Sequence, residues 1–512
     1  MKMVLVMVPV LALVLPLAAV EPCRLEVVEK ESGWPVPLVE LLTTHGVRFV
    51  TDNVGVIAFD MPELMGHEVW FDVIGHGYER DKDGFGYRGV RLTPEPGKTI
   101  KIEVKRAIIA KRLGRLTGGG LFGESQKVGR ELDWRESGIV GCDSVLNAVY
   151  RGKMFWIWGD TTLAKYPLGI FNCSGATTPV QPFKSFEPPL RPAFNYFCNA
   201  AHQPRGVAAI TGKGPKWLTG CVTLPDKHGQ PHLVASCSKI ENFLDVYEWG
   251  LCAWNDATSN FEVLRTIWKK SDAAKPPPMP EGHAALWKDA QGKEWVLFGN
   301  PLPKLRCPAT FEAWQDSATW EVLKPQEKLE VVGGGKPVTP HTGSIAWNAF
   351  RRRWVTVFME KFGKPSAFGE LWYAEADAPT GPWGPALKIL THANYTFYNP
   401  RLHPEFTPPE SPVLLFEGTY TAEFADHAAP TPRHNYNQIL YRLDLDEPAL
   451  APAQKKCRGA SVEGRVSRGE GREHLLQAPA VQAQAKPMGT NRRISNNECP
   501  MMKCRTSLFC GS

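Results

Sequence analysis

A sequence repeat between positions 140 and 445 restricts the folds that this chain can form. Predicted strands rich in aromatic residues end there at four acidic residues spaced 60, 61 and 67 positions apart, namely Asp256, Asp316, Asp377 and Asp444. A predicted hairpin precedes each of them, and a weaker copy at 232–236 brings the count to five units. Each unit can supply four strands, which is typical of a five-bladed β-propeller, so the sequence predicts this all-β fold. A single large β-sandwich is the alternative.

The first predicted hairpin brings two aspartates together. Asp143 and Asp160 are equidistant from a two-residue turn at Arg151-Gly152. Positions equidistant from such a turn lie opposite each other, with Cα atoms about 4.5–5.5 Å apart. Because like charges repel at that distance, the pair is expected to share a proton, bind a cation or work as acid and base.

Further polar residues are expected at the same end of the propeller. The innermost strand of each blade starts at one face, the second strand returns to it and the third starts there again. The aligned repeats bring nine residues to this mouth: Asp143, Asp160, His283, Asn300, His341, Glu360, Glu370, Asn399 and Glu417. Counting outward from the turns also predicts that His283 faces Asn300 and that His341 faces Glu360.

Paired carboxyl groups suit the hydrolysis of a glycosidic bond, which needs one ionised and one protonated carboxyl. We expect Asp143 to be the ionised base or nucleophile and Glu370 or Glu417 to be the acid. Asp160 is expected to hold or tune Asp143, so all four are candidate catalytic residues. A turn-capping role, in which Asp160 accepts the backbone N–H groups of the next two residues, is the alternative.

Two long loops, 179–216 and 418–437, are expected to form walls around the mouth. Sugars are recognised by carboxylates and amides that bind hydroxyl groups and by aromatic rings that cover the C–H face. The predicted substrate-binding residues are Trp158, Asn300, His341, Glu360, Asn399, Tyr420, Arg433 and Tyr436. His283 and His341 could instead ligate a metal or be core histidines. No cofactor and no dedicated metal site are predicted, and a structural cation near the axis is left open.

Gly141-Cys142-Asp143 and Trp158-Gly159-Asp160-Thr161 resemble the first blade of five-bladed propeller glycosidases of the arabinanase and xylosidase group. In that group an aspartate opens the first inner strand as catalytic base. The chain is more similar still to a family of secreted bacterial propeller proteins related to endo-D-arabinanases. Gly369–Asp377 and Phe416–Thr421 extend the match over about 300 residues. The resemblance implies a five-bladed propeller with glycoside hydrolase activity, although Cys142-Asp143-Ser144 replaces the Ala-Asp-Pro opening of the arabinanase group.

Residues 21–106 carry short alternating strands separated by Gly, Asn and Pro, which predicts a small β-sandwich. Val36–Glu40 and Val50–Gly55 resemble carboxypeptidase-regulatory-like domains, which implies an accessory module. Residues 107–139 are expected to link this sandwich to the propeller at 140–445. The segment 446–512 lacks Trp and Tyr and is expected to be disordered.

Residues 1–20 read as a signal peptide, because Lys2 precedes an apolar run broken by Pro9 and Pro16. A membrane anchor is the alternative, but we expect a secreted or periplasmic protein with no membrane contact after cleavage. Twelve cysteines in an exported chain permit disulfides. For Cys221 and Cys237, which are equidistant from Gly229, unpaired buried thiols are preferred.

The formal charge of +6 comes almost entirely from residues 446–512, which hold eleven Lys and Arg against six Asp and Glu. The remainder is nearly neutral, so no nucleic-acid partner is predicted. Motifs of metalloproteases, nucleotide-binding proteins and serine hydrolases do not occur. The sequence therefore predicts a secreted glycoside hydrolase acting on a poly- or oligosaccharide. A non-catalytic carbohydrate-binding propeller is the alternative, and the oligomeric state is not predicted.

Overall fold

The computed structural model of the chain describes residues 21–132, 138–242, 244–272, 275–392, 395–422 and 435–454. Strands dominate, and the helical elements are short: α1 Glu124–Lys127, α2 Phe311–Gln315, η1 Pro62–Leu64, η2 Gly120–Phe122, η3 Ser317–Thr319, η4 Pro404–Phe406 and η5 Pro448–Gln454. The all-β prediction is therefore confirmed. In the described part of the chain, no helix has the length and apolar character that a membrane span requires.

The N-terminal domain is built from two four-stranded sheets. One has the order β4-β1-β8-β6, with β4 Val56–Phe59, β1 Cys23–Glu29, β8 Thr99–Arg106 and β6 Tyr78–Glu79. The other has the order β3-β2-β5-β7, with β3 Arg48–Val50, β2 Glu40–Thr43, β5 Val69–Ile74 and β7 Gly89–Leu92. In β5 the apolar Val69, Phe71 and Val73 alternate with more exposed residues, so one face of the sheet packs into the core.

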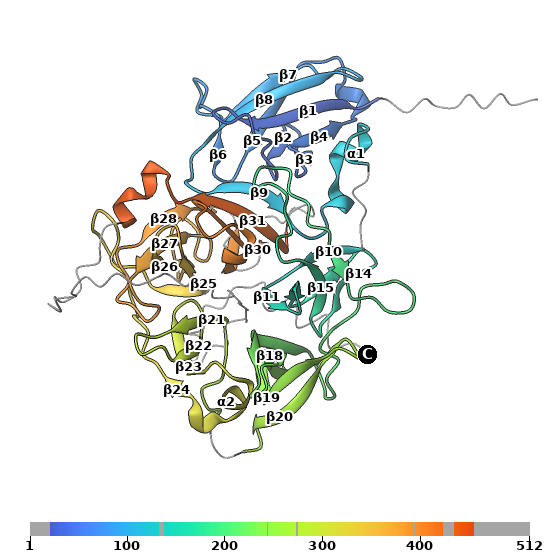
Figure 1. Cartoon of the computed structure of the whole chain (residues 1–512). Helices are drawn as coiled ribbons and strands as arrows, with labels where there is room; N and C mark the ends of the chain where they lie inside the picture. Colours follow the sequence, from blue (N-terminus) through green and yellow to red (C-terminus); the bar gives the residue numbers. More distant parts are fainter. Residues whose placement is uncertain are drawn as a thin grey trace, which may run out of the picture.

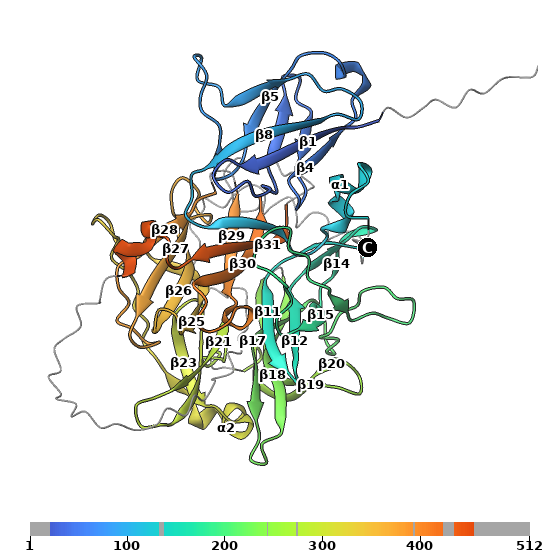
Figure 2. The same ribbon diagram turned by 45° about the horizontal axis from the view of Figure 1, so that its top comes forward.

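Five four-stranded sheets follow within the described residues, and they surround a common centre (Figures 1 and 2). Blade 1 contains β11 Val145–Tyr150, β12 Lys153–Trp158, β15 Ser174–Pro179 and β16 Asn195–Tyr196. Blade 2 contains β17 Lys216–Pro225, β18 Pro231–Glu241, β19 Asp245–Asn255 and β20 Asn260–Lys269. Blade 3 contains β21 His283–Lys288, β22 Glu294–Gly299, β23 Pro303–Pro308 and β24 Glu321–Val322.

Blade 4 contains β25 Pro340–Asn348, β26 Arg353–Glu360, β27 Leu371–Ala376 and β28 Leu387–Leu390. Blade 5 contains β29 Thr396–Leu402, β30 Val413–Thr421, β31 Asn437–Asp444 and β9 Lys111–Arg115. A further sheet beside blade 1 contains β10 Ile139–Cys142, β13 Thr161–Leu163 and β14 Tyr166–Ile170. The propeller prediction is therefore confirmed, and the single large sandwich is not formed.

Blade 5 is completed by a strand from the N-terminal side of the propeller. Lys111–Arg115, which the sequence analysis assigned to a linker, forms β9 and pairs antiparallel with β31. Leu440 lies opposite Gly114, and Tyr441 lies opposite Arg112. The ring is thus closed by hydrogen bonds between a strand that precedes blade 1 in the sequence and the third strand of blade 5. A short strand of this kind has too little apolar periodicity to stand out in the sequence.

The N-terminal domain shares an apolar core with the propeller, in which Leu25 and Phe71 belong to the same buried cluster as Phe397 and Tyr441. Arg112 of β9 lies in this contact and is 2% exposed. Its guanidinium donates to three backbone carbonyls of the N-terminal domain, those of Pro37, Gly75 and His76, at 2.9, 2.7 and 3.0 Å. The domain is therefore part of one packed body with blade 5.

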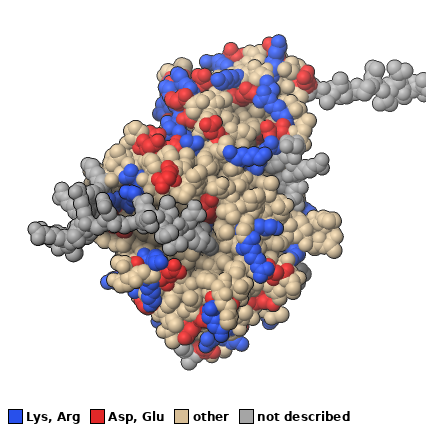
Figure 3. Space-filling view, viewed as in Figure 1, with Lys and Arg blue, Asp and Glu red and all other residues tan. Residues whose placement is uncertain are grey.

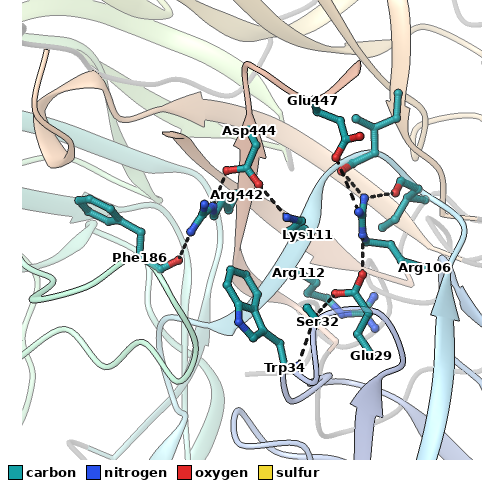
Figure 4. Close-up of polar contacts among 12 residues, drawn as sticks. Glu29, Ser32, Trp34, Arg106, Lys111, Arg112, Phe186, Arg442, Asp444 and Glu447 are labelled. Carbon is teal, nitrogen blue, oxygen red and sulfur yellow. Dashed lines mark hydrogen bonds and ion pairs between the residues drawn. The ribbon is translucent and has the colours of Figure 1, made fainter. Parts of the chain in front are cut away.

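Charged residues line the edge of this contact (Figure 4). Asp444 at the end of β31 receives Lys111 at 2.8 Å and Arg442 at 2.6 Å. Arg106 at the end of β8 pairs with Glu29 at 2.8 Å. Lys111 thus pairs β9 with β31, and Arg106 pairs β8 with β1.

The structure also bears on the predictions for the C-terminal segment and for two cysteines. Residues 446–454 were expected to be disordered, but they include η5, whose Leu450 and Ala453 are buried. Residues 455–512 and the signal segment 1–20 lie outside the described residues. Cys221 and Cys237 are both buried free thiols, as preferred from the sequence.

Candidate active site

In each blade, one residue with a left-handed backbone conformation lies within the innermost strand or directly before it. These residues have φ values of 44°, 60°, 81°, 154° and 52°, and they are Ser144, Gly220, Gly282, Gly343 and Asn399. Ser144 and Gly282 directly precede the innermost strands β11 and β21, whereas Gly220, Gly343 and Asn399 lie within β17, β25 and β29. The residues directly before them are Asp143, Thr219, Glu281, Thr342 and Tyr398. We call these ten residues the mouth ring.

Hydrogen bonds between neighbouring blades hold the mouth ring together. Each left-handed residue donates its backbone N–H to an adjacent blade: Ser144 to Thr419 Oγ1 at 2.8 Å, Gly220 to the Gly282 carbonyl at 3.1 Å, Gly282 to Thr219 Oγ1 at 2.9 Å, Gly343 to Asn300 Oδ1 at 2.7 Å, and Asn399 to Thr342 Oγ1 at 3.0 Å. Buried N–H groups need such partners. Each residue with positive φ is therefore held in place by a hydrogen bond to a neighbouring blade.

Asp143 and Asp160 meet as the sequence predicts. The β11–β12 hairpin pairs Val145 with Trp158, which is the register of a two-residue turn. Beyond that pair, the Asp143 N–H donates to the Asp160 carbonyl at 3.0 Å, and the Asp160 N–H donates to Asp143 Oδ1 at 3.1 Å. A Cβ on Gly159 would overlap Asp143 Oδ1, so only glycine fits before Asp160.

Two tyrosines from blade 5 donate to the other oxygen of Asp143. The hydroxyl of Tyr398 lies 3.0 Å from Oδ2 and that of Tyr436 lies 2.9 Å away. Asp143 is completely buried, and each of its two carboxylate oxygens accepts at least one hydrogen bond. Asp160 reaches the surface slightly, at 8% exposure, and its Oδ1 accepts the indole N–H of Trp217 from blade 2 at 3.0 Å.

Glu281 occupies the position in blade 3 that Asp143 occupies in blade 1. It is half-buried, and burial raises the pKa of its carboxyl to about 7, against the opposing effect of the nearby Lys304. A carboxyl with this pKa is protonated for part of the time at neutral pH, as a general acid requires. The sequence analysis missed Glu281 because it took His283, two residues later, as the start of the blade.

His341 and Glu360 lie at the mouth on the blade 4 side. Both are half-buried. Glu360 Oε2 accepts the indole N–H of Trp372 at 3.0 Å. Burial lowers the pKa of His341 to about 4, assisted by Lys361 and Lys304, so this imidazole is neutral at pH 7. Asn300 is also half-buried and joins blade 3 to blade 4 through Gly343.

The predicted pairings of these residues need correction. His283 pairs with Gly299 instead of Asn300, because the hairpin turn is one residue longer than expected. His341 was predicted to lie opposite Glu360. The register of β25 shifts between Pro340 and Thr342, so that Pro340 pairs with Glu360 instead. A β-bulge shifts register without a clear sequence signal.

Three predicted substrate-binding residues do not face the mouth. Trp158 is 0% exposed and stacks on Trp156 with ring centroids 6.0 Å apart, so it belongs to the core of blade 1. Tyr420 is 1% exposed and stacks on Tyr395 beneath the N-terminal domain. Asn399 is fully buried, and its amide donates to Ser144 Oγ at 2.7 Å, which makes it a scaffold residue of the ring. Arg433 lies outside the described residues.

Glu370, a predicted acid, is fully buried in a structural ion pair. Its Oε2 lies 2.7 Å from Lys388 Nζ, and its Oε1 accepts from Thr391 Oγ1 at 2.8 Å and from the Ser366 N–H at 3.2 Å. These contacts tie together the outer strands of blade 4. The prediction that Glu370 joins Asp143 at the mouth is not supported by these contacts.

Glu417, the other predicted acid, lies deeper in blade 5. Its Oε1 is 2.7 Å from Nε2 of His403, and Arg401 pairs with Glu405 at 3.2 Å beside them. All four side chains are buried. Burial lowers the pKa of Arg401 to about 10, with Glu405 and Glu417 opposing the shift. Burial also lowers the pKa of His283 well below its usual value, with Arg401 and His403 adding to the effect. This axial cluster is a buried layer of hydrogen-bonded ionisable side chains inside the propeller.

A metal site was left open near the axis. Among the described residues, no group of three or more His, Cys, Asp and Glu side chains is arranged to hold a metal ion.

No protein-family model matches the chain, and no curated protein sequence matches it. Solved structures with a similar arrangement include an exo-1,5-α-L-arabinanase from a bovine ruminal metagenomic library, with a TM-score of 0.34, 11% identity and coverage of 60% of this chain and 94% of that chain. A protein described as a glycoside hydrolase has a TM-score of 0.35, 10% identity and coverage of 65% and 67%. The Bacillus subtilis arabinanase has a TM-score of 0.30, 10% identity and coverage of 60% and 96%. The structural neighbours of this chain are thus glycoside hydrolases at low sequence identity.

Proposed function

We propose that this chain is a secreted glycoside hydrolase that cleaves a poly- or oligosaccharide at the mouth ring of its propeller. The observation that carries the proposal is the presence of two different carboxyl groups at equivalent positions of blades 1 and 3. Asp143 accepts hydrogen bonds at both oxygens, whereas burial raises the pKa of Glu281 to about 7. Two carboxyl groups in unlike environments are the requirement of glycoside hydrolysis.

In this scheme Glu281 donates a proton to the glycosidic oxygen while the bond from that oxygen to the anomeric carbon breaks. Asp143 is the ionised partner, and it either accepts a proton from the attacking water or attacks the anomeric carbon itself. Tyr398 and Tyr436 orient its Oδ2, and the Asp160 N–H orients its Oδ1. Asp160 itself is held by Trp217, so it positions Asp143 from the adjacent strand.

A carbohydrate-binding propeller without catalysis would use similar polar and aromatic groups at the mouth. It would have no need for a carboxyl group held protonated near neutral pH, because binding gains nothing from proton donation. The raised pKa of Glu281 therefore favours the hydrolase.

Export to the periplasm or the medium is part of the proposal. It rests on the apolar segment 1–20 with Lys2 at its start. Detection of the mature chain outside the cytoplasm, with its N-terminus near Glu21, tests this point. A protein that stays in the cell with an intact N-terminus would contradict it.

The activity is tested by screening the full mature chain on plant, algal and mycobacterial glycans. Wild type is compared with Asp143→Asn, Glu281→Gln and the control Glu63→Gln, which alters an exposed carboxylate of η1. We expect reducing ends to be released by wild type and by the control only. Binding of a glycan by every form, with turnover by none, would support the carbohydrate-binding alternative.

A further inference from the structure

Two lysines at the mouth have no acidic partner. Lys304 in β23 and Lys361 directly after β26 are exposed, and no ion pair involves either of them among the described residues. Some propeller lysines are paired with acids, as in Lys239–Glu248 at 2.8 Å and Lys388–Glu370 at 2.7 Å. The Lys361 ammonium lies 5.5 Å from the ring centroid of Phe362, and both lysines are exposed to an external ligand.

Both lysines lie close to groups of the mouth. The charge of Lys304 acts on Glu281 and on His341, so it stands between blades 3 and 4. The charge of Lys361 acts on His341 as well, and its backbone N–H donates to the Thr339 carbonyl at 3.0 Å, beside the start of β25. Two positive charges thus surround one half-buried imidazole.

An aromatic surface lies next to these charges. Phe362 is 67% exposed and contacts Phe368, with ring centroids 5.3 Å apart. Phe368 contacts the ring of His341 at 5.5 Å. The Nδ1 atom of His341 is buried and has no hydrogen-bond partner. Because this nitrogen is buried, a ligand hydroxyl reaches it only if the side chains around it shift, and the hydroxyl would then remove the cost of the unpartnered nitrogen.

We propose that Lys304, His341, Lys361 and Phe362 form a subsite for a sugar residue that carries an anionic group, either a carboxylate or a sulfate ester. The C–H face of the sugar packs on Phe362, a hydroxyl pairs with His341, and the anionic group lies between the two lysines. This inference rests on the proposed function, because it names the substrate class of the same mouth.

A nucleic-acid strand is a poorer fit for this subsite. Binding a phosphate backbone needs a row of cations along the strand. On the face visible in Figure 3, basic and acidic side chains are interspersed and form no continuous basic track. One pair of lysines beside a single exposed ring suits one charged sugar.

An anionic substrate would also affect Glu281. Lys304 lowers the pKa of this carboxyl, and a bound anion would offset that charge. The pKa of Glu281 would then rise in the complex, which keeps the acid protonated when an anionic sugar is in place. Substrate charge and proton donation are coupled through Lys304.

The test measures binding to matched pairs of glycans that differ only in charge. The probes are polygalacturonate oligosaccharides with their methyl esters, and sulfated galactan oligosaccharides with their desulfated forms. Titration uses the full mature chain with Asp143→Asn, so that turnover does not disturb binding, and Asp160→Asn serves as a second form should the first fail to fold. We expect at least one charged member to bind tightly and its neutral counterpart about tenfold more weakly, and the preferred pair distinguishes a carboxylate from a sulfate.

A double variant then connects this preference to the two lysines. Lys304→Gln with Lys361→Gln should reduce the preference about fivefold or more and weaken its dependence on salt, because exposed pairs are screened. The control double variant, Lys101→Gln with Lys153→Gln, removes one exposed charge from the N-terminal domain and one from the turn end of the β11–β12 hairpin, and it should retain the preference. Equal binding of charged and neutral members, binding of no probe, or full preference in the lysine double variant would each overturn the proposal.

The same experiment separates this inference from the proposed function. If the charged glycans bind preferentially but wild type hydrolyses none, the hydrolase proposal fails and the anionic subsite stands. If wild type hydrolyses a neutral glycan as fast as its charged counterpart, the subsite fails and the hydrolase stands.

Discussion

The backbone N–H of Asp160 donates to Oδ1 of Asp143 at 3.1 Å, across a hairpin end that has no room for a side chain between them. The carboxylate of Asp143 rests where a Cβ on Gly159 would be. The position of the proposed base thus depends on the absence of one methyl group.

Gly159→Ala should therefore displace the Asp143 carboxylate. Because a displacement of about 1 Å at a catalytic group can cost about 100-fold in rate, we expect a loss of that order in kcat, measured by reducing-end assay. Gly84→Ala is the control, since a Cβ there meets nothing. An alanine variant with unchanged kcat would show that Asp143 does not take part in the reaction.

Glu281→Gln should remove the proton donor and reduce kcat by about 100- to 10,000-fold. In wild type, the pKa of about 7 predicts that kcat falls as pH rises through about 7, because the acid loses its proton there. A wild-type pH profile without this alkaline limb would argue against Glu281 as the acid.

The same carboxyl makes stability depend on pH. Its pKa is about 7 in the folded chain against an ordinary value of 4.5. Between these values the folded chain keeps a proton that the unfolded chain has released, so the free energy of unfolding decreases as pH rises from about 4.5 to about 7 and levels off above. Urea titrations across this range should show the slope in wild type and a smaller one in Glu281→Gln. Equal slopes would mean that Glu281 is not held protonated by the fold.

Tyr398→Phe and Tyr436→Phe each remove a hydroxyl that donates to Asp143 Oδ2. A hydrogen bond to a charged acceptor contributes about 1.5–3 kcal/mol, so each variant should lower kcat about tenfold with little change in KM. Tyr247→Phe is a control, because its hydroxyl donates to an exposed carbonyl in blade 2. A change confined to KM would assign the two tyrosines to substrate binding.

Glu370→Gln and Glu417→Gln test whether either predicted acid takes part in the reaction. Both carboxylates have partners away from Asp143, so kcat should change less than about threefold. Glu417→Gln should reduce the free energy of unfolding by about 3 kcal/mol, because it removes the buried carboxylate that lies 2.7 Å from His403 and leaves Glu405 as the remaining partner of Arg401. Denaturant titration together with kcat measures both effects. A large loss of kcat without loss of stability would restore the sequence-based assignment.

Arg112→Met should separate the N-terminal domain from blade 5. Three buried carbonyls lose their donors, which costs about 1–3 kcal/mol each, and we expect a lower melting temperature. Calorimetry should resolve one transition in wild type and two in the variant. Arg91→Met, whose side chain is 65% exposed, is the matched control. A single unshifted transition would mean that Arg112 does not couple the two parts.

The repeats and the first hairpin could be predicted because both follow local rules. Arg151 and Gly152 adopt positive φ, as a tight two-residue turn requires, and this turn sets the register up to Trp158. Two predicted pairings were wrong by one residue, at His283 because of a longer turn and at His341 because of an irregularity in β25. A register error of one residue turns a side chain to the opposite face of its strand.

Glu281 could have been found from the sequence. Thr219-Gly220, Glu281-Gly282 and Thr342-Gly343 all place glycine directly after a mouth residue. Aligning the blades on these glycines, instead of on the ends of strands, brings Glu281 into the position of Asp143. The burial of Trp158 and Tyr420 could not be found in this way, because it depends on packing between segments far apart in the chain.

The pairing of β9 with β31 limits how this protein can be shortened. A fragment that begins at residue 140 would expose the amides and carbonyls of β31 along an open sheet edge, and such edges recruit strands from other molecules. Self-association would then replace the missing strand. The smallest soluble unit should therefore begin at β1, and a shorter catalytic fragment is expected to aggregate even with every mouth residue present.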